Sequence, residues 1–407
     1  MKILFIHNNF PGQYRRLYRY LKNDPAVDEM VVCTLETNKQ EFDLPRVVYK
    51  PHREPAQGIH PTLKPLEESM INAQNAFQKL AGLRNKGWKP DIICSHSGWG
   101  PGLFLRELWP DTRMLTFFEW YYHSSSDATY LRSNPMSEDE RVRLHMRNAS
   151  FWADLAIMDW GISPTRFQHR QLPPIFRNHV EVLHDGIDTD YLVPDPNAKL
   201  TIGDRVFTPQ DEIVTYTTRG MEPYRGFPQF MQALAQVQKK RPNLQAIIVG
   251  KDRVAYGPQR TDGKTYKQEA LEQYGLDQSR LHFLDLVPFD KLRTVFQISS
   301  LHIYFTVPFV LSWSMLEAMS TGVQLLGSDT EPVKEVVEDG KNGLLVDFRN
   351  PRDIARRMEE ALANRGRAEK LRRAARRTME ERYAAKHLLA CHRQLILDVA
   401  SGVKTCR

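Results

Sequence analysis

Two arginines bracket a turn in the second half of the chain. Arg219 follows a predicted strand, Ile213–Thr217, and Arg225-Gly226 precedes a helix predicted over Pro228–Val237. Guanidinium groups match phosphate oxygens as a fork, and a helix N-terminus presents free N–H groups. The spacing therefore predicts a clamp for a diphosphate that needs no metal. The alternative interpretation is an ordinary basic loop.

A glycine near the start of the chain is a second candidate for phosphate binding. Gly12 follows the first predicted strand, Ile3–Ile6, and precedes Tyr14–Leu21, whose apolar residues have helical spacing. The free N–H groups and the macrodipole of such a helix favour an anion at its N-terminus. A plain strand-to-helix turn explains the same residues equally well.

A glutamate is the candidate for binding a ribose. Glu317 lies in the run Leu-Glu-Ala-Met, which we expect to open a helix that ends at Gly322. An acid in the first turns of a helix that faces a ligand can accept both ribose hydroxyls. The residues just before it, Ser312, Trp313 and Ser314, join it as candidates. A first-turn glutamate is also a common helix-starting charge, which is the alternative.

Acid–base candidates lie in the first half. Glu119 follows the predicted strand Met114–Phe118, and His96 ends the run Asp91–His96. A carboxylate there could bind a sugar hydroxyl or take a proton from an acceptor, and neighbouring aromatic rings could stack on sugar rings. The candidates for contact with an acceptor are Phe10, Trp120, Tyr121 and His123. The alternative is a structural glutamate among core aromatics.

The elements that must position these residues alternate along the whole chain. Short apolar runs alternate with amphipathic stretches, which is typical of repeated βα units with a parallel sheet. In the first half we predict strands at Ile3–Ile6, Met30–Thr34, Val47–Tyr49, Asp91–Cys94, Met114–Phe118, Leu155–Met158 and Val180–Leu183. In the second half we predict them at Ile213–Thr217, Gln245–Val249, Leu281–Phe283, Leu301–Tyr304, Gln324–Gly327 and Gly343–Val346. Each half therefore has the strand count of a doubly wound α/β domain, and a cleft lined by the carboxyl ends of the strands is where we expect ligands.

A polar interval in the middle separates the two halves. From Asp185 to about Asp211 the chain is rich in Pro, Asn and Gly. We expect an N-terminal domain over 1–190, a C-terminal domain over 191–382 and a tail over 383–407. The triplet Asp188-Thr189-Asp190 resembles a metal-binding DxD motif, but it lies in this linker. No metal site is therefore predicted.

Composition limits the class of protein. The chain has 407 residues, 41% of them hydrophobic, and no apolar run long enough for a membrane span or a signal peptide, so we expect a cytoplasmic protein. Four separated cysteines, Cys33, Cys94, Cys391 and Cys406, indicate reduced thiols. The net charge of +7 is concentrated in the last 57 residues, where 15 Lys and Arg face 7 Asp and Glu. Four arginines at helical spacing would form a cationic stripe suited to an anionic membrane surface, although a solvated helix face explains them too: Arg372, Arg373, Arg376 and Arg377.

The second half resembles a known family. Several of its motifs occur in the order found in the nucleotide-sugar domain of the family 4 retaining glycosyltransferases of the GT-B fold. These are Arg219 to Phe227, Leu244–Gly250, Leu281–Pro288, Ser314–Met319 and Gly327–Val346. The first half resembles the acceptor domain of the same family more loosely, through Asp91–His96 and Val182–Asp188.

The resemblance implies a fold, an activity and further site residues. The fold would be GT-B, with two doubly wound Rossmann-like domains facing each other across a cleft and the tail packing back on the first. The activity would be metal-independent, cofactor-free transfer of a hexose from a UDP- or GDP-sugar to a hydroxyl, with retention. The acceptor would be a glycan, glycolipid or protein, in the synthesis of polysaccharide, lipopolysaccharide or another glycoconjugate. Gly250, Lys251 and Val287 would join the donor site.

Two positions depart from the family pattern. Phe309 stands eight residues before Glu317, where the family usually has a glutamate that contacts the transferred sugar. Glu119 stands where the family usually has a histidine. Other functions therefore stay open. A nucleotide-sugar epimerase of this fold would isomerise the donor without an acceptor product, and a catalytically silent binder would bind it without turnover. A nucleic-acid binder, suggested only by the basic tail, would show steep salt dependence and is the least favoured.

Overall fold

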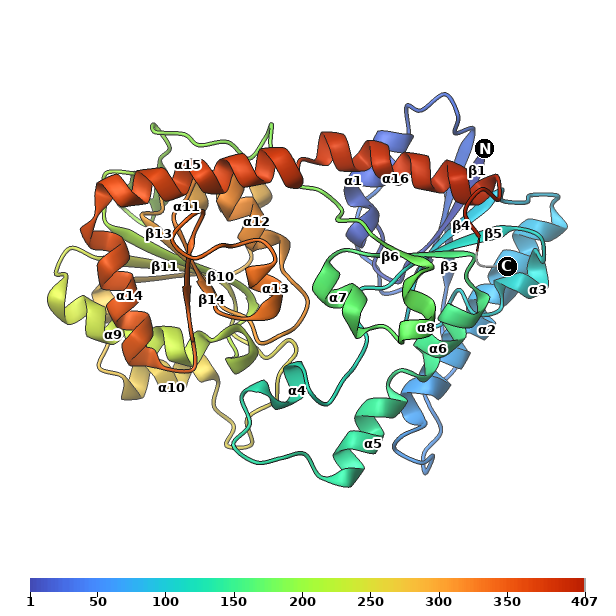
Figure 1. Ribbon diagram of the computed structural model, residues 1–407. Coiled ribbons are helices and arrows are strands. Elements are labelled where there is room, and N and C mark those ends of the chain that lie inside the picture. Colours follow the sequence, from blue (N-terminus) through green and yellow to red (C-terminus); the bar gives the residue numbers. More distant parts are fainter. Residues whose placement is uncertain (406–407) are drawn as a thin grey trace. The chain divides into compact units, whose positions relative to one another are not determined.

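The computed structural model describes residues 1–405, so Cys406 lies outside the described residues. The chain forms two compact units (Figure 1). The first comprises Met1–Ser125, Asn134–Gly186 and Ala385–Arg407, and the second comprises Ser126–Ser133 and Ile187–Ala384. The chain thus leaves the first unit after residue 186 and returns at residue 385, whereas the sequence analysis placed boundaries at 190 and 382. The short segment 126–133 belongs to the second unit although it is surrounded in sequence by the first.

The first unit is built on a sheet of seven parallel strands in the order β3-β2-β1-β4-β5-β6-β7. The strands are β1 (Lys2–Ile6), β2 (Glu29–Leu35), β3 (Arg46–Tyr49), β4 (Ile92–His96), β5 (Arg113–Phe117), β6 (Trp160–Ser163) and β7 (Val180–Val182). The strand order reverses between β1 and β4. In an open parallel sheet, ligands bind outside the carboxyl ends of the strands at such a reversal.

Helices cover both faces of this sheet. They are η1 (Gly12–Tyr14), α1 (Arg15–Leu21), α2 (Lys64–Asn85), α3 (Leu105–Leu108), α5 (Glu138–Met146), α6 (Ala149–Ile157), α7 (Arg166–Gln171), α8 (Pro174–Arg177) and α16 (Ala385–Ala400). Alternate residues of β1 point to opposite faces, as strand geometry requires. Ile3 and Phe5 pack with α1 and α16, and Leu4 and Ile6 pack with α2 and α3.

One predicted strand of the first half is wrong. Residues 155–158, expected as a strand, lie at the end of helix α6 and just after it. The sheet gains its additional strand from β6 instead, which pairs in parallel with β5 and β7. Leu155 and Met158 are buried in a small cluster with Phe118, so the apolar signal came from core packing and not from a strand.

The second unit has a six-stranded parallel sheet in the order β12-β11-β10-β13-β14-β15. Its strands are β10 (Ile213–Gly220), β11 (Gln245–Lys251), β12 (Leu281–Leu284), β13 (Leu301–Tyr304), β14 (Leu325–Ser328) and β15 (Leu344–Val346). The order reverses between β10 and β13. The interval that we expected to be a linker contains an antiparallel hairpin, β8 (Leu200–Ile202) and β9 (Arg205–Phe207). The two sheets confirm the predicted α/β class of two doubly wound Rossmann-like domains.

The helices of the second unit flank its sheet (Figure 1). They are α4 (Asp127–Tyr130), η2 (Pro223–Arg225), α9 (Phe227–Lys240), α10 (Tyr266–Gln273), η3 (Gln278–Arg280), α11 (Phe289–Gln297), α12 (Trp313–Ser320), α13 (Glu331–Lys334), α14 (Pro351–Ala363) and α15 (Arg365–Arg382). The helix α4 comes from the inserted segment. Its Tyr130 stacks on Phe348, with ring centroids 5.8 Å apart, and Phe348 in turn stacks on Phe305.

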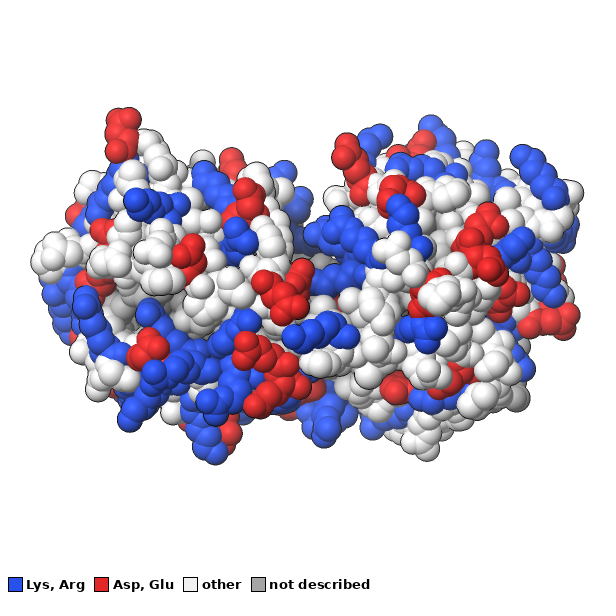
Figure 2. Space-filling model, turned by 90° about the horizontal axis from the view of Figure 1, so that it is seen from above, with Lys and Arg blue, Asp and Glu red and all other residues white. Residues whose placement is uncertain are grey.

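The arginines of α15 do not form the single cationic stripe that their spacing predicted. Arg372, which is half-buried, donates to the carbonyls of Ser299 and Ser300 at 3.2 and 3.0 Å. Arg376 donates to the carbonyls of Leu192 and Ser320 at 2.6 and 2.8 Å. These two side chains therefore join α15 to neighbouring parts of the second unit. Helix α15 also packs against α12. Figure 2 shows basic and acidic side chains interspersed over the face that it presents.

Candidate functional site

In the first unit, an oriented chain of hydrogen bonds ends at Glu119. The Nδ1 atom of His7 accepts the N–H of Asn9 at 3.0 Å, so its Nε2 carries the proton and donates to Oε1 of Gln13 at 2.8 Å. The amide of Gln13 is thereby fixed with its NH2 group toward Glu119, and donates to Oε1 of that carboxylate at 2.8 Å. His7 follows β1 and Glu119 follows β5, so the chain lies at the carboxyl ends of the strands.

His96 faces the other oxygen of the same carboxylate. Its Nδ1 lies 2.9 Å from the carbonyl of Ser97 and donates to it, so Nε2 of the neutral ring is an acceptor. This Nε2 has no hydrogen-bond partner among residues 1–405 and lies 3.7 Å from Oε2 of Glu119. When the ring is neutral, two acceptors therefore face each other. A hydroxyl placed beside them could donate its proton to one of them.

The electrostatics keep this cluster poised to accept a proton. Burial, together with the charge of His96, lowers the pKa of His7 to about 3, so His7 stays neutral and keeps its orienting role. Burial alone would raise the pKa of Glu119, but the imidazole of His96 and the amide of Gln13 outweigh it and bring that pKa below its ordinary value. Glu119 is therefore ionised at neutral pH. About 33% of its side chain is exposed, so a ligand can reach it.

A buried scaffold holds the loop after β4. Trp99 stacks on His96 with ring centroids 4.2 Å apart. The carboxylate of Asp154, on α6, accepts the N–H of Gly98 at 2.8 Å, and Asn72, on α2, donates to the carbonyl of Trp99 at 3.0 Å. Burial raises the pKa of Asp154 to about 7, against the lowering effect of the Gly98 N–H. Two helices thus position the ring that backs His96.

Most of the aromatic residues predicted to contact an acceptor lie in the core. Phe10 is fully buried among Phe5, Tyr14 and Tyr18, so it offers no surface to a ligand and its predicted role is corrected. Trp120 is 5% exposed and Tyr121 is 6% exposed. The hydroxyl of Tyr121 accepts the indole N–H of Trp152 at 2.6 Å, and the Nε2 atom of His123 lies 2.6 Å from the carbonyl of Gln171.

Gly12 has a packing role that its predicted role did not include. It begins the short η1 turn before α1 and has a φ of +44°. A Cβ placed there would lie 2.5 Å from the ring of His7. The glycine thus allows the backbone to approach the imidazole that orients Gln13, because any side chain would displace that ring.

In the second unit, Arg225 is buried where the strand order reverses. Its Nη1 donates to Thr306 Oγ1 at 2.7 Å and to the Tyr304 hydroxyl at 3.3 Å, and both nitrogens lie 3.4 Å from the carbonyl of Val310. Arg225 is only 8% exposed. It therefore joins the turn after β10 to the loop after β13. The Phe309 ring, 9% exposed, packs 5.8 Å from the guanidinium carbon.

Arg219 lies at the surface beside Tyr256, a residue that the motif analysis did not single out. It donates from Nη1 to the Tyr256 hydroxyl at 3.2 Å. The Tyr256 ring lies 5.2 Å from the guanidinium carbon of Arg225 and 5.3 Å from the ring of Phe309. Tyr256 therefore connects both predicted phosphate ligands. No motif marks it, because its loop follows β11 and reaches the arginines only in three dimensions.

The predicted glycines allow close backbone approaches in the second unit. Gly226 has a φ of +66° and is the N-cap of α9, and a Cβ there would meet Phe305 at 2.7 Å. Gly250 lies near the end of β11, where a Cβ would meet the carbonyl of Thr218 at 2.2 Å. Lys251 is exposed and its carbonyl accepts the N–H of Met221 at 3.1 Å. Val287 lies half-buried in the loop after β12.

Helix α12 begins earlier than predicted. It spans Trp313–Ser320 with Ser312 as its N-cap, whose hydroxyl accepts the N–H of Ser314 at 3.3 Å. Glu317 is therefore in the second turn and not the first. It is 6% exposed and shares a helix face with Ser314, three residues earlier. Gly322 follows the helix with a φ of +71°, as a helix-ending glycine does.

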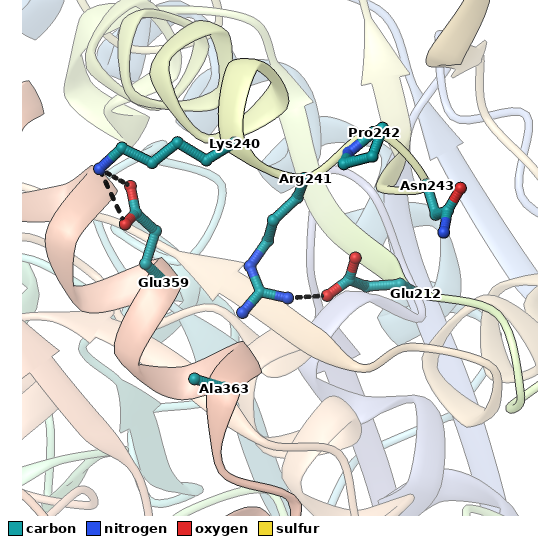
Figure 3. Close-up of a pocket in the computed structure, with 7 residues that line it drawn as sticks. All are labelled: Glu212, Lys240, Arg241, Pro242, Asn243, Glu359 and Ala363. Atoms are coloured by element: carbon teal, nitrogen blue, oxygen red, sulfur yellow. Dashed lines mark hydrogen bonds and ion pairs between the residues drawn. The ribbon is translucent and has the colours of Figure 1, made fainter.

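A pocket in the second unit lies away from these residues. Figure 3 shows it between the end of α9 and α14, where Lys240 pairs with Glu359 at 2.9 Å and Arg241 pairs with Glu212. Glu212 directly precedes β10 and Asn243 lies two residues before β11, so the pocket is at the amino ends of the strands. Its charges satisfy one another. Ligands of this architecture bind at the opposite edge, so the pocket is not the candidate donor site.

Within residues 1–405 there is no group of three His, Cys, Asp or Glu side chains suited to a metal ion. Asp188 of the DxD triplet accepts the N–H of Tyr191 at 3.0 Å. Across the described part of the chain, no helix is both long and apolar enough to cross a membrane.

Two doubly wound units, with polar clusters at both reversals of strand order, define a nucleotide-binding α/β protein of GT-B type. Residues 27–192 match the description "Glycosyl transferase family 4 group", and residues 202–378 match "Glycosyl transferases group 1". Together these regions span most of the chain. The protein therefore belongs to the family 4, group 1 glycosyltransferases, which confirms the family predicted from its motifs.

Solved structures have the same fold at low sequence identity. Sucrose-phosphate synthase from Thermosynechococcus elongatus superposes with a TM-score of 0.74 at 16% identity, over 99% of this chain and 100% of that one. HepE from Anabaena, in complex with UDP and glucose, superposes with a TM-score of 0.65 at 17% identity, over 98% and 100%. Spore coat protein SA of Bacillus subtilis is 33% identical over 81 residues, which is 19% of this chain and 22% of that protein.

The sequence analysis did not identify the residues that hold other site residues in position. His7, Gln13 and Trp99 follow β1 and β4, so the reversal of strand order could have indicated them. Nothing in the sequence marks Glu222 and Tyr256. The carboxylate of Glu222 accepts the backbone N–H of Tyr256, and this contact depends on how two loops pack together.

Proposed function

We propose that the protein transfers a hexose from a UDP-sugar to the hydroxyl of a glycan, glycolipid or protein acceptor, with retention and without a metal. The observation that carries this proposal is the pair of arginines at the reversal of strand order in the second sheet. Arg219 is exposed, and Arg225 anchors the adjoining loop through Thr306. Fixed cations and the N-terminus of α9 can stabilise the charge of a departing diphosphate without reorganising.

The remaining donor contacts follow from the elements around this pair. Glu317, which is 6% exposed, and the half-buried Ser314 share one face of α12 near its N-terminus, and we assign the ribose to Glu317. Gly250, Lys251 and Val287 lie at or beyond the carboxyl ends of β11 and β12, the edge at which this fold binds nucleotides. HepE, which shares the fold, binds UDP, glucose and UDP-glucose, and this favours a UDP-sugar over a GDP-sugar as the donor to test first.

The acceptor would be activated by the cluster in the first unit. An acceptor hydroxyl beside this pair would donate its proton to the Glu119 carboxylate, whose Oε2 lies 3.7 Å from Nε2 of His96. His7 and Gln13 hold the carboxylate in place. The first contact with the acceptor would be made by Glu119, whose side chain is 33% exposed, because His96, Phe10, Trp120 and Tyr121 are all buried.

A thermal-shift panel tests the donor site. UDP-glucose, GDP-mannose and dTDP-glucose are added to the wild type, to Glu317→Gln and to the control Glu381→Gln, an exposed glutamate on α15. We expect a UDP-sugar to raise the Tm of the wild type and the control, and to raise it much less in Glu317→Gln, since a ligand stabilises only the state that it binds.

Product analysis separates the rival functions. Incubation with UDP-glucose and a mixture of glycan acceptors should release UDP with a glycosylated product. Isomerised donor without that product would indicate an epimerase, and donor binding without UDP release would indicate a silent binder. If no nucleotide stabilises the wild type, the proposed function is wrong.

A further inference from the structure

Two exposed side chains, Arg219 and Tyr256, lie beside buried groups near the end of β10. Arg225 and Phe309 are 8% and 9% exposed, and Glu222 is fully buried. Arg219 is exposed and the Tyr256 side chain is 40% exposed. A ligand that arrives here therefore meets the Arg219 guanidinium and the Tyr256 ring before it meets the buried groups.

A buried carboxylate fixes the position of Tyr256. Glu222, in the turn between the two arginines, accepts the backbone N–H groups of Ala255, Tyr256 and Gly257 at 3.3, 3.0 and 2.7 Å. Three backbone donors offset the cost of burying a charge. Gly220 completes the contact, because a Cβ there would lie 2.6 Å from the carbonyl of Arg253. The loop after β11 is therefore joined to the turn after β10 along its length.

The two ends of the Tyr256 side chain have different surroundings. Its hydroxyl accepts a hydrogen bond from Arg219 at 3.2 Å. Its ring packs against Phe309 and the guanidinium of Arg225, at 5.3 and 5.2 Å. A cation next to an aromatic face can bind an anionic group and pack against the C–H groups of a neighbouring sugar ring. A sugar diphosphate has both groups.

We propose that Tyr256 is a donor-contacting residue, with its hydroxyl holding Arg219 on the diphosphate and its ring packing against the transferred sugar. The inference rests on the proposed function and names the residue that would recognise the sugar. The two ends predict separate consequences. Loss of the hydroxyl would weaken the binding of any UDP compound, and loss of the ring would remove the preference for a UDP-sugar over UDP.

Calorimetric titration with UDP and with UDP-glucose tests both consequences. For Tyr256→Phe we expect Kd to rise several-fold for both ligands, with an unchanged ratio between them. For Tyr256→Ala we expect a similar rise for UDP, and a larger one for UDP-glucose that brings the two constants together. Tyr266→Phe and Tyr266→Ala are matched controls, because Tyr266 lies on α10 and its hydroxyl donates to the carbonyl of Pro258, at 3.3 Å, where that of Tyr256 accepts from Arg219. The controls should bind as the wild type does.

The outcomes separate this inference from the proposed function. If the wild type binds UDP-glucose more tightly than UDP and Tyr256→Ala keeps that ratio, Tyr256 does not contact the sugar and the function stands. If Tyr256→Phe leaves both constants unchanged, the hydroxyl does not hold Arg219 on the diphosphate. If the wild type binds neither ligand, both proposals are wrong. Far-UV circular dichroism verifies that each variant is folded.

Discussion

At the scale of single residues, the candidate acid–base group depends on neighbours that never ionise. His7 stays neutral because burial lowers its pKa to about 3, and only a neutral His7 with its proton on Nε2 orients Gln13 correctly. Gln13 then donates to Glu119 and helps to keep that carboxylate charged. An imidazolium at His7 would also donate from Nδ1, where the Asn9 N–H now donates, and the chain would be disrupted.

The charge of Glu119 leads to a prediction on pH dependence. Its folded-state pKa lies below the ordinary value, so kcat/KM should be constant through neutral pH and fall only as the pH drops through that lowered pKa. Glu119→Gln should reduce kcat by about 10²- to 10⁴-fold, the usual contribution of a positioned acid–base group, while the Kd for UDP changes less than about twofold.

Steady-state transfer assays between about pH 4 and 8, with UDP titrations alongside, make the measurement. Glu54→Gln is the control, because Glu54 is an exposed glutamate of the same unit. Full activity in Glu119→Gln would show that the carboxylate takes no part in the chemistry. A folding contribution of Glu119 has the same sign: it is present at neutral pH and lost as the pH falls.

Whether a site residue could be found from the sequence depends on where it lies relative to the end of a strand. Arg219, His96 and Glu119 could be singled out because they lie in the last two residues of a strand or within two residues after it, where a parallel sheet gathers polar groups, and Arg225 because it lies in the turn that follows β10. Phe10 could not be judged correctly, because a buried ring and a stacking platform look alike in sequence. Its burial depends on helices α1 and η1 folding back over β1.

At the scale of elements, the turn from β10 into α9 requires a glycine. Gly226 has a φ of +66°, and a Cβ would meet Phe305 at 2.7 Å and Phe348 at 2.8 Å. Gly226→Ala should therefore pay both the left-handed backbone cost of about 1–2 kcal/mol and an overpacking cost of about 1–3 kcal/mol. The Kd for UDP should rise as well, since α9 would move away from the diphosphate.

Urea unfolding and UDP titration measure the two effects of Gly226→Ala. Gly275→Ala is the matched control, because Gly275 has the same φ of +66° and nothing within 4 Å of the added Cβ. It should lose only the backbone term and keep UDP affinity. Equal destabilisation in the two variants would mean that the contacts with Phe305 and Phe348 add no overpacking cost.

Element prediction succeeded where the apolar run had clear limits and failed where it did not. The run Leu155–Met158 is as short as a strand, but it belongs to the apolar helix α6, and a four-residue apolar run does not distinguish the two. The strand β6 was missed because Trp160–Ser163 includes a glycine and a serine, which weaken the strand pattern. The β8–β9 hairpin was missed because each strand has only three residues, too few to show an alternating pattern.

At the scale of the whole molecule, the chain passes between the two units at neighbouring points. Ile187 donates its N–H to the carbonyl of Tyr383 at 2.7 Å, within the second unit. Gly186 lies against Ala385 in the first, where a Cβ would approach the Ala385 Cα to 2.6 Å. The tail then continues as α16, where Arg393 pairs with Asp24 and His392 contacts the carbonyl of His184. The last residues of the chain thus complete the core of the unit that its first residues begin.

This arrangement predicts that a change in the tail destabilises the first unit selectively. Ile396 is 1% exposed and packs in one core cluster with Phe5, Leu17 and Phe117. Ile396→Ala should cost about 2–5 kcal/mol in the free energy of unfolding, because truncating a buried isoleucine leaves a cavity. Ile175→Ala, at a side chain that is 77% exposed, should cost less than about 0.5 kcal/mol.

The distribution of tryptophans makes the effect measurable by unit. Six of the seven lie in the first unit and only Trp313 lies in the second, so intrinsic fluorescence reports mainly on the first. In urea, Ile396→Ala should shift the fluorescence transition to lower concentration, because α16 supplies part of that core. The Kd for UDP, which depends on contacts within the second unit, should stay within about twofold of the wild type in the absence of urea. A fluorescence transition that does not shift would mean that the tail is not part of the cooperative core of the first unit. A large loss of UDP affinity would mean that the tail supports the donor site itself, and the two units would then have to be treated as one thermodynamic body.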